Sequence, residues 1–161
     1  MIKNKKIFLI LCCIVFLGFV LRTYNLGKES FWVDEAYSVH ETQFSLDRIK
    51  FGTDANPPLY YYLLYFWNKL VGITEFNVRM LSVIFGTASI WFLYLLGKNV
   101  FNDEVGLYAA LMLAVSPIHI LYSQEARNYS LLFMFSLISM HSYLNLRKNF
   151  SKISIIYYRE L

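Results

Sequence analysis

The sequence has few charged residues for its length, and this shortage bears first on the class of protein. Only 16% of the 161 residues are charged, whereas a soluble domain carries about 25%. Hydrophobic residues make up 57% of the chain and aromatic residues 19%. Because the apolar residues come in long blocks, the composition argues against an ordinary soluble domain and indicates a protein with several membrane spans.

Proline and cysteine are also scarce, with three and two residues. Repeats, low-complexity tracts and Gly/Ser linkers are lacking, so the simplest organisation is one domain over residues 1–161. Cys12 and Cys13 both lie in an apolar run. Adjacent side chains on a helix point about 100° apart, so we expect no disulfide between them. They are interpreted as small apolar residues and do not indicate a redox compartment.

Four uncharged runs approach the roughly 20 residues that a helix needs to cross a bilayer. They are Ile7–Leu21, Met80–Gly97, Val105–Gln124 and Asn128–Leu146. The first also fits a cleaved signal peptide, but no small-x-small cleavage pattern follows it, which favours a retained span. The sequence therefore predicts an all-α, polytopic transmembrane helix bundle of about four spans.

Basic residues at both ends of this set predict the orientation of the chain. Three lysines precede the first run, and Arg147, Lys148 and Lys152 follow the fourth. Positive residues mark the cytoplasmic side of a membrane, so we expect a cytoplasmic N-terminus in a multi-pass plasma-membrane protein. The loop Arg22–Arg79 and the turn Ser123–Arg127 then lie outside. The net charge of +4 is accounted for by topology and does not indicate nucleic-acid binding.

The second half of the outer loop, Pro57–Asn68, is uncharged and dense in tyrosine and tryptophan. It is too short to span a bilayer as a helix. Because Tyr and Trp prefer the headgroup level, the segment predicts a juxtamembrane helix on the membrane surface that starts at the two prolines. The alternative is a re-entrant or fully buried short helix.

Two adjacent carboxylates, Asp34 and Glu35, follow the first apolar run. They fit a general base beside a positioning or metal-binding group. The alternative is a solvated pair in an ordinary outer loop. The flanking Phe31, Trp32 and Tyr37 favour a pair that is held against the membrane interface, where a membrane-bound substrate can reach it.

Arg79 stands at the outer start of the second long run. It can snorkel to the headgroups, hold a phosphate or pair with Glu75 four residues earlier. Asn56 precedes the two prolines, where a loop turns into the predicted surface helix. These residues alone leave the alternatives open.

The short outer turn between the third and fourth runs carries Gln124, Glu125 and Arg127. An arginine at that depth faces a lipid phosphate or an acidic side chain, although a plain polar hairpin turn is equally compatible. His119 is interpreted as a packed interfacial residue. It has no metal-ligand spacing with His40 or His141.

Four strings occur in an order that resembles a known family. They are Trp32–Tyr37, Asn56–Tyr61, Asn77–Ser82 and Tyr122–Tyr129. Their order resembles the N-terminal part of a GT-C glycosyltransferase of the protein mannosyltransferase and aminoarabinose transferase superfamily. Within it, the dolichyl-phosphate-mannose-protein mannosyltransferase-like proteins are the most similar. That family usually has His where Asn56 stands. Its members are also longer, so the chain resembles an N-terminal fragment, a truncated frame or one half of a split protein.

The resemblance implies sugar transfer from a polyprenyl-phosphate carrier to a protein, lipid or glycan acceptor on the outer face. Asp34 is then the general base, and Glu35 orients the base or the acceptor. Arg79 and Arg127 steady the leaving phosphate or fix the acidic pair, and Glu125 is a second carboxylate near the reaction. Candidate substrate-binding residues in the same strings are Asn56, Gln124 and Tyr129.

No cofactor is implied beyond the lipid-linked donor. A divalent cation at the acidic pair is compatible with the resemblance, but no ligand spacing demands one. The alternative function is that of a non-catalytic membrane protein, such as a subunit, a scaffold or a truncated remnant. A transporter has less support, because transporters hold polar groups within their spans and the acids here lie outside them.

Overall fold

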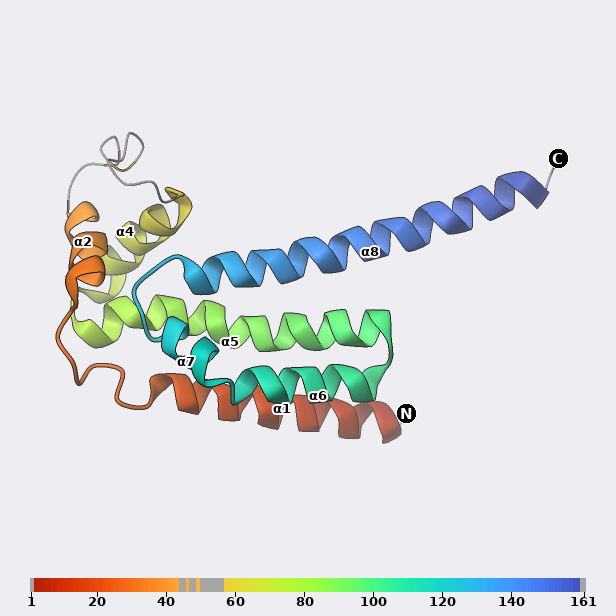
Figure 1. Cartoon of the computed structure of the whole chain (residues 1–161), viewed down its shortest axis with the longest axis horizontal. Helices are drawn as coiled ribbons and strands as arrows, with labels where there is room; N and C mark the ends of the chain where they lie inside the picture. The colour runs from red at the N-terminus through yellow and green to blue at the C-terminus, as the bar shows by residue number, and fades with distance from the viewer. Residues whose placement is uncertain (1, 44–45, 47–48, 50–56, 160–161) are drawn as a thin grey trace.

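A computed structural model describes residues 2–43, 46, 49 and 57–159, and within these residues the fold is helical without strands. The helices are α1 (Ile2–Thr23), α2 (Val33–Glu41), α4 (Leu59–Val71), α5 (Glu75–Val100), α6 (Asp103–Ala114), α7 (Pro117–Ser123) and α8 (Tyr129–Arg159). Figure 1 shows α5 in the middle of the bundle, with α8 on one side and α1 and α6 on the other. The predicted all-α helical bundle is confirmed.

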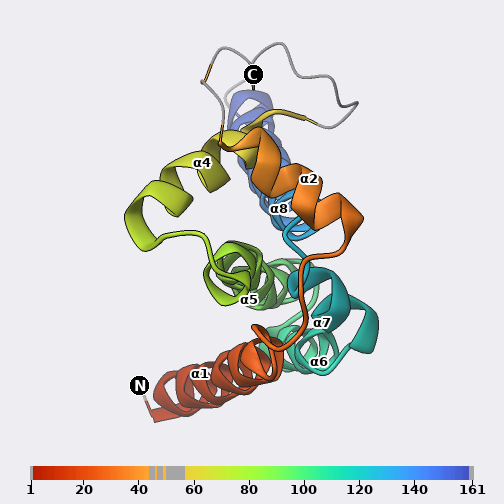
Figure 2. The same cartoon turned by 90° about the vertical axis from the view of Figure 1, so that its left-hand side faces the viewer.

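The helices gather their connecting loops at two opposite ends. α2, α4 and the turn between α7 and α8 lie at one end, which we call the loop end (Figures 1 and 2). The N-terminus and the turn between α5 and α6 lie at the other end (Figure 1). This arrangement brings residues 24–43 and 123–129 to the same end of the bundle. A functional site built from both segments needs them to be close together.

Two helices are long and apolar enough to cross a membrane, Lys5–Thr23 and Glu75–Val100. A third crossing is available if α6 and α7 together count as one span, but these two helices are bent by 63° at the break between them. Residues 129–146 of the fourth predicted run lie in α8. Since α8 does not meet the same test within its described residues, a fourth crossing stays a prediction.

The third predicted run, residues 105–124, does not form one continuous helix. α6 ends at Ala114, and α7 begins at Pro117 after the N-cap Ser116, whose hydroxyl accepts the backbone N–H of His119. A proline inside a helix removes one backbone donor and clashes with the carbonyl four residues earlier. At the first turn of a new helix it costs nothing, so the chain restarts there at a new angle.

The predicted short helix after the two prolines is present as α4, which begins at Leu59. Its inner face buries Tyr60, Tyr61 and Leu64 against α5, where they form a core with neighbours from α2, α5 and α8. Its outer face exposes Phe66 and Leu70. An aromatic face buried on the protein and an apolar face left outside suit a helix at the membrane interface.

A second core lies toward the opposite end, where α1, α5 and α6 meet closely. Glycines permit this approach. A Cβ on Gly106 would stand 2.7 Å from the carbonyl oxygen of Tyr94 and 3.0 Å from the backbone nitrogen of Lys98. Both atoms belong to the backbone of α5, so neither can move without moving the helix. Small residues at such contacts let helices pack closely in lipid.

We therefore expect Gly106→Ala to push α6 away from α5 and to lower the free energy of unfolding by about 1–3 kcal/mol. The measurement is thermal unfolding of the purified protein in detergent. Met112→Ala on the same helix is the matched control, because that side chain is 72% exposed. A Gly106→Ala variant as stable as the wild type would show that the close contact between α5 and α6 does not contribute to stability.

Candidate functional site

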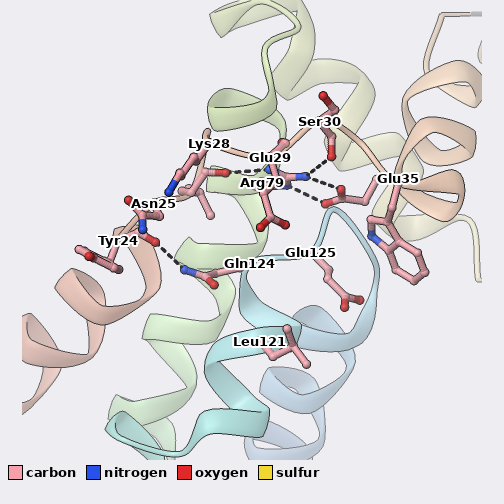
Figure 3. A pocket seen from close by; sticks show the side chains of 12 residues that line it. Tyr24, Asn25, Lys28, Glu29, Ser30, Glu35, Arg79, Leu121, Gln124 and Glu125 are labelled. Atoms are coloured by element: carbon pink, nitrogen blue, oxygen red, sulfur yellow. Dashed lines mark hydrogen bonds and ion pairs between the residues drawn. The ribbon is translucent and has the colours of Figure 1, made fainter.

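The centre of the loop end is an ion pair between α2 and α5. Glu35, in the first turn of α2, is fully buried, and Arg79 is 6% exposed. Arg79 Nε donates to Glu35 Oε1 at 2.9 Å and Nη2 donates to Oε2 at 2.7 Å (Figure 3). The backbone N–H of Ala126 donates to Oε1 as well, at 2.9 Å. One carboxylate thus joins α2, α5 and the α7–α8 turn.

The remaining donors of Arg79 hold the loop that leads from α1 to α2. Nη1 donates to the carbonyl oxygens of Leu26 and Glu29, both at 2.8 Å. Nη2 also donates to the carbonyl oxygen of Ser30 at 3.2 Å. Together with the two bonds to Glu35, all five N–H donors of the guanidinium are engaged. Figure 3 shows these bonds converging on Arg79.

This arrangement bears on the alternatives left open for Arg79. Its bidentate partner is Glu35, 44 residues away in sequence, and not Glu75. Arg79 is buried, and its N–H groups are engaged by Glu35 and by three backbone carbonyls, which leaves none to offer a phosphate. Its role in a reaction stays a prediction. Bidentate arginine–carboxylate pairs add geometric specificity to their energy, and here the pair sets the position of α2 on α5.

Asp34 differs from its neighbour. It is half-buried, and no hydrogen bond to its carboxylate is found in the part of the chain that the structure describes. Its backbone carbonyl accepts from Ser38 Oγ at 3.0 Å and from Arg127 Nη1 at 3.4 Å. The two adjacent acids therefore have different surroundings. The Glu35 carboxylate is hydrogen-bonded to Arg79 and to the Ala126 N–H, while that of Asp34 is available for a ligand.

Arg127 lies in the α7–α8 turn, donates to the backbone carbonyl of Asp34 and is 9% exposed. Burial opposes its charge, but Tyr61, Asp34 and Tyr129 outweigh that effect and raise the pKa of Arg127. Tyr129, the first residue of α8, packs its ring edge-to-face on Tyr122 at 5.0 Å between centroids. The arrangement keeps a permanent positive charge beside the free carboxylate.

The other two candidates of the turn line a cavity. Gln124 Nε2 donates to the carbonyl oxygens of Arg22 and Tyr24, at 3.1 and 2.9 Å, and so joins the turn to the end of α1. The carboxyl of Glu125 is partly buried, and this burial, followed by the charge of Glu35, raises the pKa of Glu125. Asn56, the remaining candidate, lies outside the described residues.

The cavity lies between the α1–α2 loop and the α7–α8 turn and has a volume of about 490 Å³ (Figure 3). It is lined by Tyr24, Asn25, Leu26, Lys28, Glu29, Ser30, Trp32, Glu35, Arg79, Leu121, Gln124 and Glu125. Among the described residues, no three His, Cys, Asp or Glu side chains come together as a metal site would require.

Sequence reasoning missed Arg22, which is fully buried at the end of α1. Its Nη1 donates to the carbonyls of Gly18 and Ala114 at 2.8 and 3.1 Å. Its Nη2 donates to the carbonyl of Leu113 at 3.0 Å and to His119 Nδ1 at 2.9 Å. The guanidinium thus satisfies the free carbonyls at the end of α6, where a cation is favourable. The only sequence signal for this role was an arginine at the edge of an apolar run. The same pattern is typical of a charged residue that flanks a membrane span.

We expect Arg22→Met to lower the free energy of unfolding by about 1–3 kcal/mol for each carbonyl left buried and unpaired. Arg22→Lys cannot replace it, since an ammonium lacks the planar fork that bridges α1, α6 and α7. Thermal unfolding in detergent measures the loss. The control is Arg147→Met, a residue in α8 that is exposed. Equal stability of the Arg22 and Arg147 variants would contradict the capping role.

Comparison with known proteins identifies one family. The family model described as dolichyl-phosphate-mannose-protein mannosyltransferase matches residues 55–155, more than half of the chain. The matched range includes Arg79, Glu125 and Arg127, and it begins after the acidic pair. Searches of curated proteins and of solved structures found no match.

Proposed function

The chain belongs to the dolichyl-phosphate-mannose-protein mannosyltransferase family, and from that premise we propose that it transfers a sugar from a polyprenyl-phosphate carrier to a hydroxyl acceptor. The apolar helices and the family together indicate an integral-membrane glycosyltransferase of the GT-C type. The proposed reaction takes place at the loop end, on the outer face of the plasma membrane, with the N-terminus in the cytoplasm.

The observation that carries the proposal is the unequal use of the two acids. The ion pair and the Ala126 N–H hold Glu35 against segments inside the family match. The neighbouring residue Asp34 meets the same turn, where its backbone carbonyl accepts a hydrogen bond from Arg127 Nη1 at 3.4 Å. A free carboxylate at a fixed position next to a permanent cation suits a base that works beside an anionic leaving group.

In the proposed reaction, the Asp34 carboxylate takes the proton of the acceptor hydroxyl. The acceptor oxygen forms a bond to the anomeric carbon as the bond from that carbon to the phosphate oxygen breaks. The electron pair of the broken bond leaves with the polyprenyl phosphate. Because a phosphate is a good leaving group, charge stabilisation by Arg127 replaces the general acid that glycoside hydrolysis needs. Glu35 and Arg79 act as positioning residues.

The test uses the native gene product in lipid vesicles with membrane acceptors. One sample receives a polyprenyl-phosphate sugar that carries a radiolabelled hexose, and a second receives the same hexose as a nucleotide sugar. We expect label in the acceptor fraction from the lipid-linked donor alone. Label from the nucleotide sugar would contradict the donor class. Absence of transfer with a panel of lipid-linked hexoses would favour a non-catalytic subunit or scaffold.

A further inference from the structure

A chain of buried hydrogen bonds links α4 to the α7–α8 turn. Tyr60, in the first turn of α4, is 1% exposed, and its hydroxyl oxygen lies 2.8 Å from Ser82 Oγ on α5. Ser82 is fully buried as well, and its Oγ donates to the backbone carbonyl of Arg127 at 3.3 Å. The three residues thus connect an outer helix, the central helix and the turn that carries Arg127.

The direction of this chain follows from the number of protons in it. A serine hydroxyl has one hydrogen to donate, and Ser82 gives it to the Arg127 carbonyl. Tyr60 is therefore the donor in its bond to Ser82. Burial raises the pKa of Tyr60, so the hydroxyl keeps the proton that this bond needs. Donation from Tyr60 strengthens the bond from Ser82 to Arg127, which is long for a hydroxyl donor.

Ser82 differs in this respect from three other helical serines. Ser38, Ser89 and Ser136 each donate to the carbonyl four residues earlier in their own helix, at 2.9 to 3.0 Å, a common choice for a serine inside a helix. Ser82 instead reaches a carbonyl 45 residues along the chain. Its hydroxyl therefore serves the position of the turn and not the local order of α5.

The Arg127 backbone that Ser82 holds lies between two contacts to α2. The N–H of the preceding Ala126 donates to Glu35 Oε1 at 2.9 Å, and Arg127 Nη1 donates to the carbonyl of Asp34 at 3.4 Å. Ser82 thus ties the backbone of Arg127 to α5 while the side chain of Arg127 reaches α2. A shift of this backbone would move the guanidinium relative to Asp34.

Other contacts hold α4 on the protein. Leu64 is fully buried in the core that α4 shares with α5. Farther along α4, Trp67 Nε1 donates to the carbonyl of Asn77 at 2.7 Å. We therefore expect α4 to stay in place without the Tyr60 hydroxyl, so that removing this hydroxyl affects Ser82 and the turn and leaves the packing of the helix intact.

We propose, building on the proposed function, that Tyr60 is a positioning residue for sugar transfer. Through Ser82 it fixes the backbone of Arg127, and with it the place of the cation that stabilises the leaving phosphate. Tyr60 is almost completely buried, so it acts through Ser82 and not on a substrate. The short helix whose outer face suits the membrane interface thereby contributes to the geometry of the site.

The first test compares Tyr60→Phe with Tyr62→Phe in the native gene product in lipid vesicles. Tyr60→Phe keeps the ring and removes only the donor. Tyr62 is the matched control, because it lies on the same helix, is half-buried and makes no side-chain hydrogen bond within the described residues. A displacement of about 1 Å can cost about 10²-fold in rate. For the smaller shift after loss of one hydroxyl, we expect kcat to fall about tenfold in Tyr60→Phe, with unchanged KM for the acceptor and a wild-type unfolding temperature.

A second variant tests whether the effect passes through Arg127. Arg127→Lys alone is expected to lower kcat, because an ammonium lacks the planar fork of a guanidinium. In that background, Tyr60→Phe should lower kcat by less than about threefold, since residues that act through one group are not additive. A tyrosine that serves only the packing of the core would lower kcat by the same factor in both backgrounds.

Amide hydrogen exchange gives a readout that does not depend on activity. We expect peptides that cover residues 123–129 to exchange about two- to tenfold faster in Tyr60→Phe than in Tyr62→Phe, because the turn loses part of its anchor. Unchanged exchange there, equal kcat in the two variants or equal factors in the two Arg127 backgrounds would overturn the positioning role. Faster exchange in a protein whose wild type transfers no sugar would remove the proposed function and leave the link between α4 and the turn. Wild-type transfer by Tyr60→Phe with unchanged exchange would remove the positioning role alone.

Discussion

Replacing Asp34 by Asn is expected to lower sugar transfer about 10²–10⁴-fold, which is the usual contribution of a general base. The amide has nearly the shape of the carboxylate but cannot take up a proton. The Asp34 carboxylate makes no hydrogen bond within the described residues, so its loss leaves no partner unsatisfied. We therefore expect wild-type thermal stability and membrane insertion together with the loss of activity.

The measurement is the initial rate of label transfer from the lipid-linked donor, with protein amount and unfolding temperature determined in parallel. Glu104→Gln is the control for a carboxylate lost from the opposite end of the molecule. An Asp34→Asn variant that transfers sugar at the wild-type rate would remove Asp34 from the mechanism. A variant that loses activity and stability together would assign Asp34 a structural role.

Breaking the Glu35–Arg79 pair is the second large effect that we expect. Removing one partner of a buried ion pair leaves an uncompensated charge and costs about 3–5 kcal/mol. Glu35→Gln also weakens the bond from the Ala126 N–H. Arg79→Met additionally frees the carbonyls of Leu26, Glu29 and Ser30, so it should be the more damaging of the two. Arg79→Lys should not rescue it, since an ammonium cannot replace the planar fork.

A double-mutant cycle in detergent measures the pairing directly. We expect the double variant Glu35→Gln, Arg79→Met to lose less stability than the sum of the single losses, with a coupling of about 0.5–3 kcal/mol. Strict additivity would show that the two side chains do not act as a pair. Activity should fall in each single variant even at temperatures where the protein stays folded, because α2 carries Asp34 and loses its anchor.

Local patterns predicted the helices well where hydrophobicity alone decides. The apolar runs appear as parts of α1, α5, α6, α7 and α8, and the aromatic segment after the two prolines appears as α4. The break in the third run was missed, although its signal, a serine followed by Pro117, stands in the sequence. The capping of the end of α6 by Arg22 could not be predicted from local sequence, because Arg22 lies 92 residues before Ala114, whose carbonyl it binds.

The candidate residues were chosen from motifs, and the structure gathers most of those that it describes at the loop end. Their individual roles were not readable from the motif. Asp34 and Glu35 are adjacent carboxylates in the same helical turn, and nothing in their local sequence says which one is buried. Only the neighbours that reach them from α5 and the α7–α8 turn distinguish the two.

The sequence by itself determined the class of the protein, the positions of most helices and the short set of polar residues that chemistry could use. These follow from composition and hydrophobic runs, which act over one helix at a time. The tertiary structure decided that Glu35 joins α2, α5 and the α7–α8 turn, that the Asp34 carboxylate has no hydrogen bond within the described residues, and that Glu125 lines a cavity. Such roles depend on which donors meet which acceptors across long stretches of chain, and the Arg79–Glu35 bond joins residues 44 positions apart. Local sequence does not encode that pairing, because it forms only when separate helices pack against each other.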